Sequence, residues 1–123
     1  MGASARSAME LKVATRAVEW ARETLGLTNA EVGVVLGASE RTVIRWSQQA
    51  HPPRREHRDR IEKLNELRHL LSSVFGDDED ALREWLHEPV PALRGRAPLS
   101  LVAKGELDDV IGLLAGLESG AFI

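Results

Sequence analysis

The chain has 123 residues, the size of one domain or of two very small ones that share an interface. With 43% hydrophobic and 28% charged residues, its composition is that of a globular protein and excludes disorder throughout. The absence of cysteine excludes a disulfide scaffold, a thiol nucleophile and a thiolate zinc site.

No segment has the pattern of a membrane or export signal. No apolar run reaches the roughly 20 residues that a membrane helix needs. No basic segment is followed by the apolar run of a signal peptide. We therefore expect a cytoplasmic protein with no membrane partner.

The net charge of −3 hides a difference between the two halves of the chain. Residues 1–70 hold 12 Lys and Arg against 9 Asp and Glu, whereas residues 71–123 hold 4 against 10. Such a split either has no functional meaning or indicates two roles, one of which faces a polyanion.

Helical periodicity dominates the sequence, and no stretch shows the alternation and β-branched enrichment of a strand, so the chain is predicted to be all-α. Apolar residues recur at helical spacing over residues 8–25, 28–36, 40–49, 54–75 and 106–118. A short helix is expected between a cap at Asp77 or Asp78 and Glu88-Pro89. Residues 89–104 form a connector with several prolines and leucines, which we expect to be ordered and packed.

Residues 28–48 have the pattern of a DNA-reading helix-turn-helix. Thr28 and Glu31 have the spacing of a capping box for its first helix, and Ser39 can cap its second. Gly33 allows the two helices to approach closely, and Gly37 supplies a left-handed turn conformation. The small core that sets the interhelical angle is predicted to consist of Val32, Leu36, Val43 and Trp46.

The polar positions of the second helix would face the major groove of DNA, where Arg41 or Arg45 can bind a guanine and Glu40 can accept from a cytosine amine. The arginines that follow would contact the backbone and add sequence-independent affinity. The predicted DNA-binding residues are Ser39, Glu40, Arg41, Thr42, Arg45, Gln48, Arg54 and Arg55. The alternative is an αα-hairpin with a solvated polar face, followed by the charged first turn of an exposed helix.

No residue pattern indicates catalysis or a cofactor. Residues 77–80 lack the glycine and distal glutamate of a calcium loop, and the helix dipole explains their charge. The four histidines do not have metal-ligand spacing, and no phosphate-binding glycine loop, nucleophile elbow or catalytic carboxylate pair is visible. We expect no metal, no cofactor and no enzymatic activity. Gly112 and Gly116 form a small-residue pair, which we expect to allow close core packing.

The second half of the chain contains an ordered set of residues around the predicted connector. The set is Trp85-Leu86, Pro89, Pro91-Ala92-Leu93, Gly95-Arg96, Pro98-Leu99 and Gly105-Glu106-Leu107, with Leu113-Leu114 beyond. This order resembles the toxin-binding domain of Xre/MbcA/ParS-type antitoxins, and residues 28–48 resemble the Xre-like helix-turn-helix. The resemblance covers about residues 10–120. Arg94 departs from the pattern, because a smaller residue, often glycine, is expected before Gly95.

The resemblance implies a helix-turn-helix domain over residues 1–70 and a toxin-binding domain over residues 71–123. It implies a type II antitoxin that covers the active-site opening of a RES-domain toxin, which acts on NAD or transfers ADP-ribose from it, and that represses its own operon. The implied toxin-binding residues are Trp85, Leu93, Arg94, Arg96, Pro98, Leu99, Gly120, Ala121, Phe122 and Ile123. The tryptophan, the leucines and the proline among them are equally suited to hold the fold.

The charge pattern agrees with these roles. A protein that reads an operator usually binds two half-sites about one helical turn apart, so we expect a homodimer. The acidic second half suits a basic partner, because complementary charge speeds the encounter. The alternative function is a free-standing dimeric helix-turn-helix regulator whose second half only dimerises.

Overall fold

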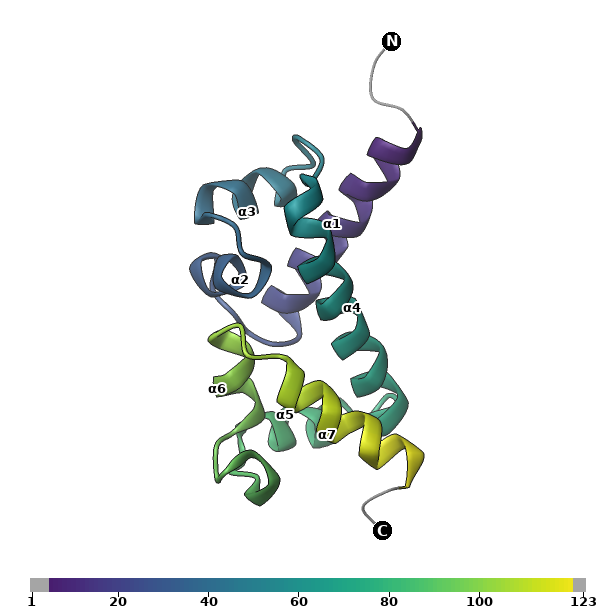
Figure 1. The fold of residues 1–123 in the computed structure, drawn as a ribbon, viewed down its shortest axis with the longest axis vertical. Helices are drawn as coiled ribbons and strands as arrows, with labels where there is room; N and C mark the ends of the chain where they lie inside the picture. Colours follow the sequence, from purple (N-terminus) through teal and green to yellow (C-terminus); the bar gives the residue numbers. More distant parts are fainter. Residues whose placement is uncertain (1–4, 121–123) are drawn as a thin grey trace. The chain divides into compact units, whose positions relative to one another are not determined.

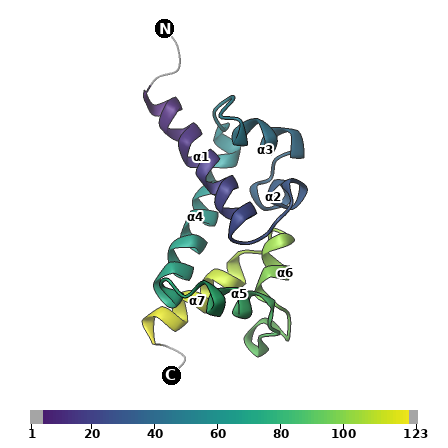
Figure 2. The same ribbon diagram turned by 180° about the vertical axis from the view of Figure 1, so that it is seen from behind.

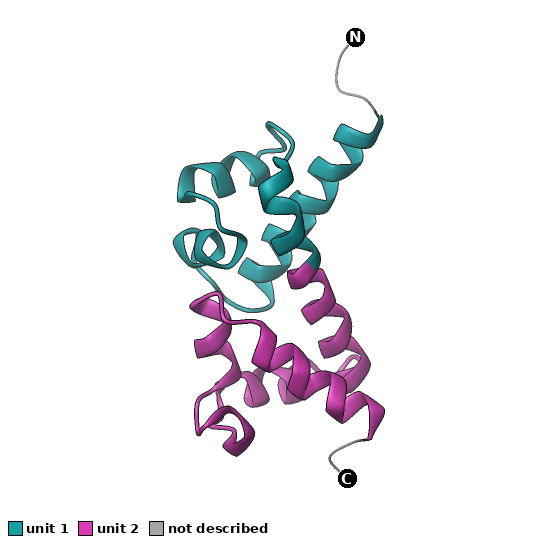
Figure 3. Ribbon diagram, viewed as in Figure 1, with its two compact units in different colours: residues 1–62 teal, residues 63–123 magenta. Residues whose placement is uncertain are grey.

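The computed structural model describes residues 5–120, and within them the chain folds into seven α-helices and one short 3-10 helix without a strand (Figure 1). The prediction of an all-α fold is therefore confirmed. The chain divides into two compact units, residues 1–62 and residues 63–123 (Figure 3). The division lies inside one long helix, earlier than the predicted domain boundary after residue 70.

The first unit consists of α1 (Ala5–Glu23), α2 (Asn29–Leu36), α3 (Glu40–Ser47) and the beginning of α4 (Arg55–Phe75). Helices α1, α2 and α3 all contact one another, as Figures 1 and 2 show from two sides. The side chains that these helices bury completely or almost completely are Ala14, Ala17, Val18, Ala21, Val32, Val35, Leu36, Val43 and Trp46.

Capping residues define where α2 and α3 begin, as predicted. The Glu31 amide donates to the Thr28 hydroxyl at 3.1 Å, and the Thr28 amide donates to the Glu31 carboxylate at 2.9 Å. This pair forms the capping box and satisfies two amides that the helix itself leaves unpaired. The Ser39 hydroxyl accepts from the Thr42 amide at 3.1 Å in the same way. Gly37 ends α2 in a left-handed conformation with φ of 65°.

The second unit consists of the rest of α4, α5 (Glu79–His87), the 3-10 helix η1 (Pro91–Leu93), α6 (Pro98–Ala103) and α7 (Asp108–Ser119). Helix α6 contacts α5 and α7, and α7 also contacts η1. The Asp78 carboxylate caps α5 by accepting from the Ala81 amide at 3.0 Å. The core of this unit includes Leu64, Leu67, Leu71, Leu86, Leu101, Val102, Val110 and Leu114.

The main differences from the sequence prediction concern α1, α3 and α6. Helix α1 runs over Ala5–Glu23 rather than 8–25, because Gly26 and the residues before it form the turn into α2. Helix α3 ends at Ser47 rather than 49, because Gln49 takes a left-handed conformation with φ of 57°. The predicted connector contains a helix of its own, α6, which is too short to show helical periodicity and is marked only by Pro98 in its first turn.

The small-residue pair in the last helix does not have the expected role at its first position. Gly112 is exposed, and a Cβ atom built there would meet no atom within 4 Å among the described residues. The prediction of close core packing at Gly112 is therefore wrong, because this position faces open space on α7.

Candidate functional site

Helix α3 presents a polar face that its buried residues hold in place. Val43 and Trp46 are buried beneath it. The buried Thr15 hydroxyl of α1 donates to the Trp46 carbonyl at 2.7 Å, which ties α1 to the end of α3. The predicted DNA-binding residues on the other side are exposed or, for Thr42, half-buried, namely Ser39, Glu40, Arg41, Thr42, Arg45 and Gln48.

The turn before α3 requires its two glycines for different reasons. A Cβ atom at Gly33 would lie 2.5 Å from the carbonyl oxygen of Ala38, so only glycine fits at this close approach. Gly37 has the left-handed conformation that other residues adopt at a cost of about 1–2 kcal/mol. Both predicted roles are confirmed, and together they set the short turn between α2 and α3.

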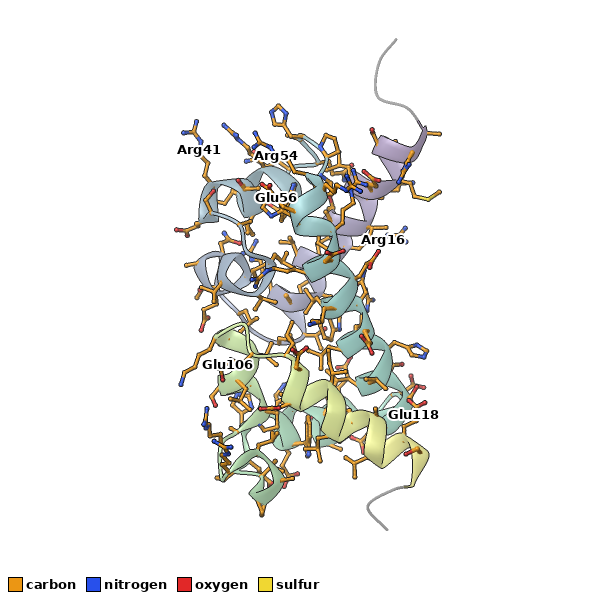
Figure 4. The ribbon with its side chains drawn as sticks, viewed as in Figure 1. Arg16, Arg41, Arg54, Glu56, Glu106 and Glu118 are labelled. Carbon is orange, nitrogen blue, oxygen red and sulfur yellow. The ribbon has the colours of Figure 1, made fainter. Side chains whose placement is uncertain are left out.

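Beside α3 lies a concavity of about 520 Å³. It brings together the predicted residues Thr42, Arg45 and Arg54, whereas Arg55 is exposed but is not part of its lining. Figure 4 shows Arg41 and Arg54 projecting outward at the end of this unit that carries α3. The concavity also contains His51 and His57, which the sequence prediction missed, because only tertiary packing brings the loop and the start of α4 beside α3.

A second concavity, of about 500 Å³, lies in the other unit between the segment around η1 and α7. The predicted residues Leu93, Arg94 and Arg96 line it, together with Asp109 and the exposed Gly112. Arg96 lies 3.6 Å from Glu106 as an ion pair. Arg94 has no ion pair or side-chain hydrogen bond within the part of the chain that the structure describes. The lining on α7 was missed, because only tertiary packing brings α7 to this segment.

The residues predicted to contact a toxin differ in burial. Leu93 and Pro98 are buried, and Trp85 and Leu99 are half-buried. The Trp85 ring packs against Phe75 at a centroid distance of 5.5 Å, so this side chain holds α5 against the end of α4. Gly120 is the left-handed residue that ends α7. The other predicted contacts, Ala121, Phe122 and Ile123, lie outside the described residues.

Arg94 has a left-handed backbone, with φ of 60° and ψ of 35°. Because this conformation is strained for a residue with a Cβ atom, we expect Arg94→Gly to stabilise the second unit by about 0.5–1 kcal/mol. The measurement is the urea concentration at the unfolding midpoint, with the slope of unfolding free energy against urea concentration unchanged. Arg96→Gly is the control, and its midpoint is expected to fall, because Arg96 is not left-handed, so glycine only adds conformational freedom to the unfolded chain and removes the ion pair with Glu106. A lower midpoint for Arg94→Gly would contradict the prediction.

No helix within residues 5–120 is long and apolar enough to cross a membrane. The same residues contain no group of three or more histidines and carboxylates that could hold a metal ion.

Comparison with known proteins agrees with this arrangement. Residues 70–120 match the family described as the antitoxin Xre/MbcA/ParS C-terminal toxin-binding domain. The mycobacterial cidal antitoxin MbcA of Mycobacterium tuberculosis is 33% identical over 115 residues, which cover 94% of this chain and 100% of MbcA. A probable mycobacterial cidal antitoxin of the same organism is 30% identical over 103 residues, 84% of this chain and 86% of that protein.

The fold is also similar to a chain in the crystal structure of the M. tuberculosis MbcT–MbcA toxin–antitoxin complex. The TM-score is 0.59 at 33% identity, over 89% of this chain and 96% of that one. The helical fold and these matches define an antitoxin, a class of protein that acts by binding rather than by catalysis. The chain belongs to the Xre/MbcA/ParS family of antitoxins.

Proposed function

We propose that this chain is a cytoplasmic type II antitoxin that binds a cognate RES-domain toxin, covers its active site and represses their common operon. The observation that carries the proposal is the similarity to MbcA over nearly the whole of both chains, together with the likeness to one chain in the crystal structure of the MbcT–MbcA complex. The toxin would consume NAD or transfer ADP-ribose from it, as the family resemblance implies.

The toxin would contact the second unit at the concavity between η1 and α7 and along residues 120–123. Arg94 supports this assignment, because an exposed charged side chain stands there at a strained backbone position. The unpaired guanidinium of Arg94 is free to bind a carboxylate of a partner. Pro98 is buried and would support this surface from below, and the largely buried Leu93 would form part of its floor.

Deletion of residues 120–123 tests the toxin-binding half of the proposal. We expect the truncated chain to lose neutralisation of the co-expressed toxin, measured as host growth, while it still retards its own promoter fragment. A full-length Arg41→Ala variant is the control and should neutralise the toxin normally. Unchanged rescue by the truncated chain would refute the role of these residues in covering the active site.

Replacement of Arg45 tests the operator-binding half. Because a bidentate arginine–guanine contact contributes about 1–3 kcal/mol of discrimination, Arg45→Ala is expected to weaken operator binding roughly 5- to 150-fold in a mobility-shift titration at fixed salt. Arg22→Ala removes the same charge from the end of α1 and should change affinity little. Toxin binding should be unaltered in both variants. Unaltered operator affinity in Arg45→Ala would show that α3 is not the recognition helix.

The operator-binding form would be a homodimer. Met9 and Val13 of α1 are 68% and 40% exposed, and they line an apolar groove together with the buried Ile61. Exposed apolar side chains of this kind support self-association.

A free-standing dimeric regulator would bind DNA in the same way, so a pull-down from the host distinguishes the two functions. A stoichiometric NAD-consuming partner supports the antitoxin, whereas recovery of the homodimer alone supports the regulator.

A further inference from the structure

The concavity beside α3 is lined by basic, polar and aromatic residues and by no acidic residue. Its walls come from three segments, with Thr42 and Arg45 on α3, Arg54 in the loop that follows, and His57 in the first turn of α4. His51 and Pro52 complete the rim, and Trp46 lies beneath. The ionisable side chains in this lining are all basic types, and no aspartate or glutamate is part of it. A hollow of this composition favours an anion.

His57 is held in a fixed orientation at this concavity. Its ring packs edge-on against the buried Trp46 ring, at a centroid distance of 5.3 Å and an interplanar angle of 73°. Its Nε2 atom lies 3.7 Å from a carboxylate oxygen of Glu56, and its side chain is only 13% exposed. Its Nδ1 atom is buried and has no hydrogen-bond partner among the described residues. A ring fixed in this way is a preorganised wall rather than a freely moving surface side chain.

The two arginines at the concavity are available for a ligand. Arg45 and Arg54 are both exposed, and neither forms an ion pair within residues 5–120. The hydroxyl of Thr42 is half-buried beside them and lies 2.9 Å from the Ser39 hydroxyl. Guanidinium groups and hydroxyls are the donors that proteins use most for phosphate oxygens.

We propose that this concavity is a binding pocket for a single phosphate group, and that its ligand in the complex with DNA is one backbone phosphodiester. The proposal rests on the proposed operator function and deepens it. It adds His51 and His57 to the DNA interface, and it assigns the bound phosphate to Arg54 rather than to Arg55. One clamped phosphate beside Arg45 would fix the register in which the exposed face of α3 meets the bases. A free phosphate or a nucleotide offers the same chemistry and is distinguished by the test.

The test uses the full chain and follows the His57 ring and Trp46 indole signals by NMR. Inorganic phosphate is added at constant pH and ionic strength, with chloride as reference, and a duplex of the chain's own promoter is added in a second series. We expect saturable shifts with both ligands. Arg54→Gln should weaken phosphate binding at least fivefold, whereas the matched variant Arg22→Gln, at the end of α1 and outside the pocket, should change it less than twofold.

The DNA series has a quantitative expectation of its own. Loss of one phosphate contact in Arg54→Gln should reduce the slope of log affinity against log salt by about 0.9. Single phosphates of the duplex are replaced in turn by methylphosphonate. At one position this replacement should weaken binding of the wild-type protein but not of Arg54→Gln.

The outcomes separate this proposal from the operator function. Absence of saturable shifts with both ligands, or equal effects of Arg54→Gln and Arg22→Gln on phosphate binding, would overturn the pocket, even if the promoter is still bound. Saturable shifts with inorganic phosphate but not with the promoter would support the pocket as a site for small phosphates and refute operator binding.

Discussion

Replacement of Trp46 by alanine is expected to destabilise residues 1–62 by about 3–5 kcal/mol, the range for removing a buried large aromatic side chain. Trp46 is 1% exposed and is the largest fully buried side chain of the described residues. Its ring packs against His57, and its backbone carbonyl accepts from Thr15. The cavity left by the indole would loosen α3 against both α1 and α4, so operator binding is expected to fall with stability.

The measurement for Trp46→Ala is hydrogen exchange of backbone amides, because it reports the two units separately. The free energy of opening measured at the Val35 and Leu36 amides should fall by the same amount, about 3–5 kcal/mol. The Leu114 amide serves as the internal reference for the second unit. Ile44→Ala is the matched control on the same helix. Ile44 is 37% exposed, so its effect should stay within about 1 kcal/mol. A loss of less than about 1 kcal/mol in Trp46→Ala would contradict the assigned core.

Replacement of Gly33 by alanine is expected to cost about 1–3 kcal/mol, the usual range for overpacking. The new methyl group would lie 2.5 Å from the Ala38 carbonyl oxygen, which belongs to the backbone and cannot rotate away. The turn between α2 and α3 must therefore open, and the polar face of α3 must tilt. We expect operator affinity to fall while toxin binding is retained.

Gly112→Ala is the matched control for this prediction. It is the same substitution in a helix, but nothing lies within 4 Å of the added Cβ atom. Alanine in an exposed helix interior is expected to be more stable than glycine by about 0.5–1 kcal/mol. Thermal unfolding should therefore shift in opposite directions for the two variants. A rise in the unfolding temperature of Gly33→Ala would show that the close approach at Gly33 is relieved without strain.

Local sequence determined much of the first unit. The capping box at Thr28, the cap at Ser39 and the left-handed Gly37 depend on neighbours within a few residues, so spacing alone predicted them. The exposed face of α3 followed from helical periodicity in the same way. The order of prolines, glycines and leucines after Trp85 identified the antitoxin family, because this motif is a local sequence pattern.

Tertiary packing decided what local sequence could not. Helix α6 is too short for periodicity to reveal, and its contacts with α5 and α7 hold it in place. Gly112 was expected to allow close core packing, but it faces open space and lines a concavity that exists only because η1 and α7 pack together. The pocket beside α3 joins Thr42, Arg54 and His57 from three segments. Residues from three segments form one site only after the helices have packed. The sequence therefore predicted arginines as DNA contacts but not the pocket that Arg45 and Arg54 line together.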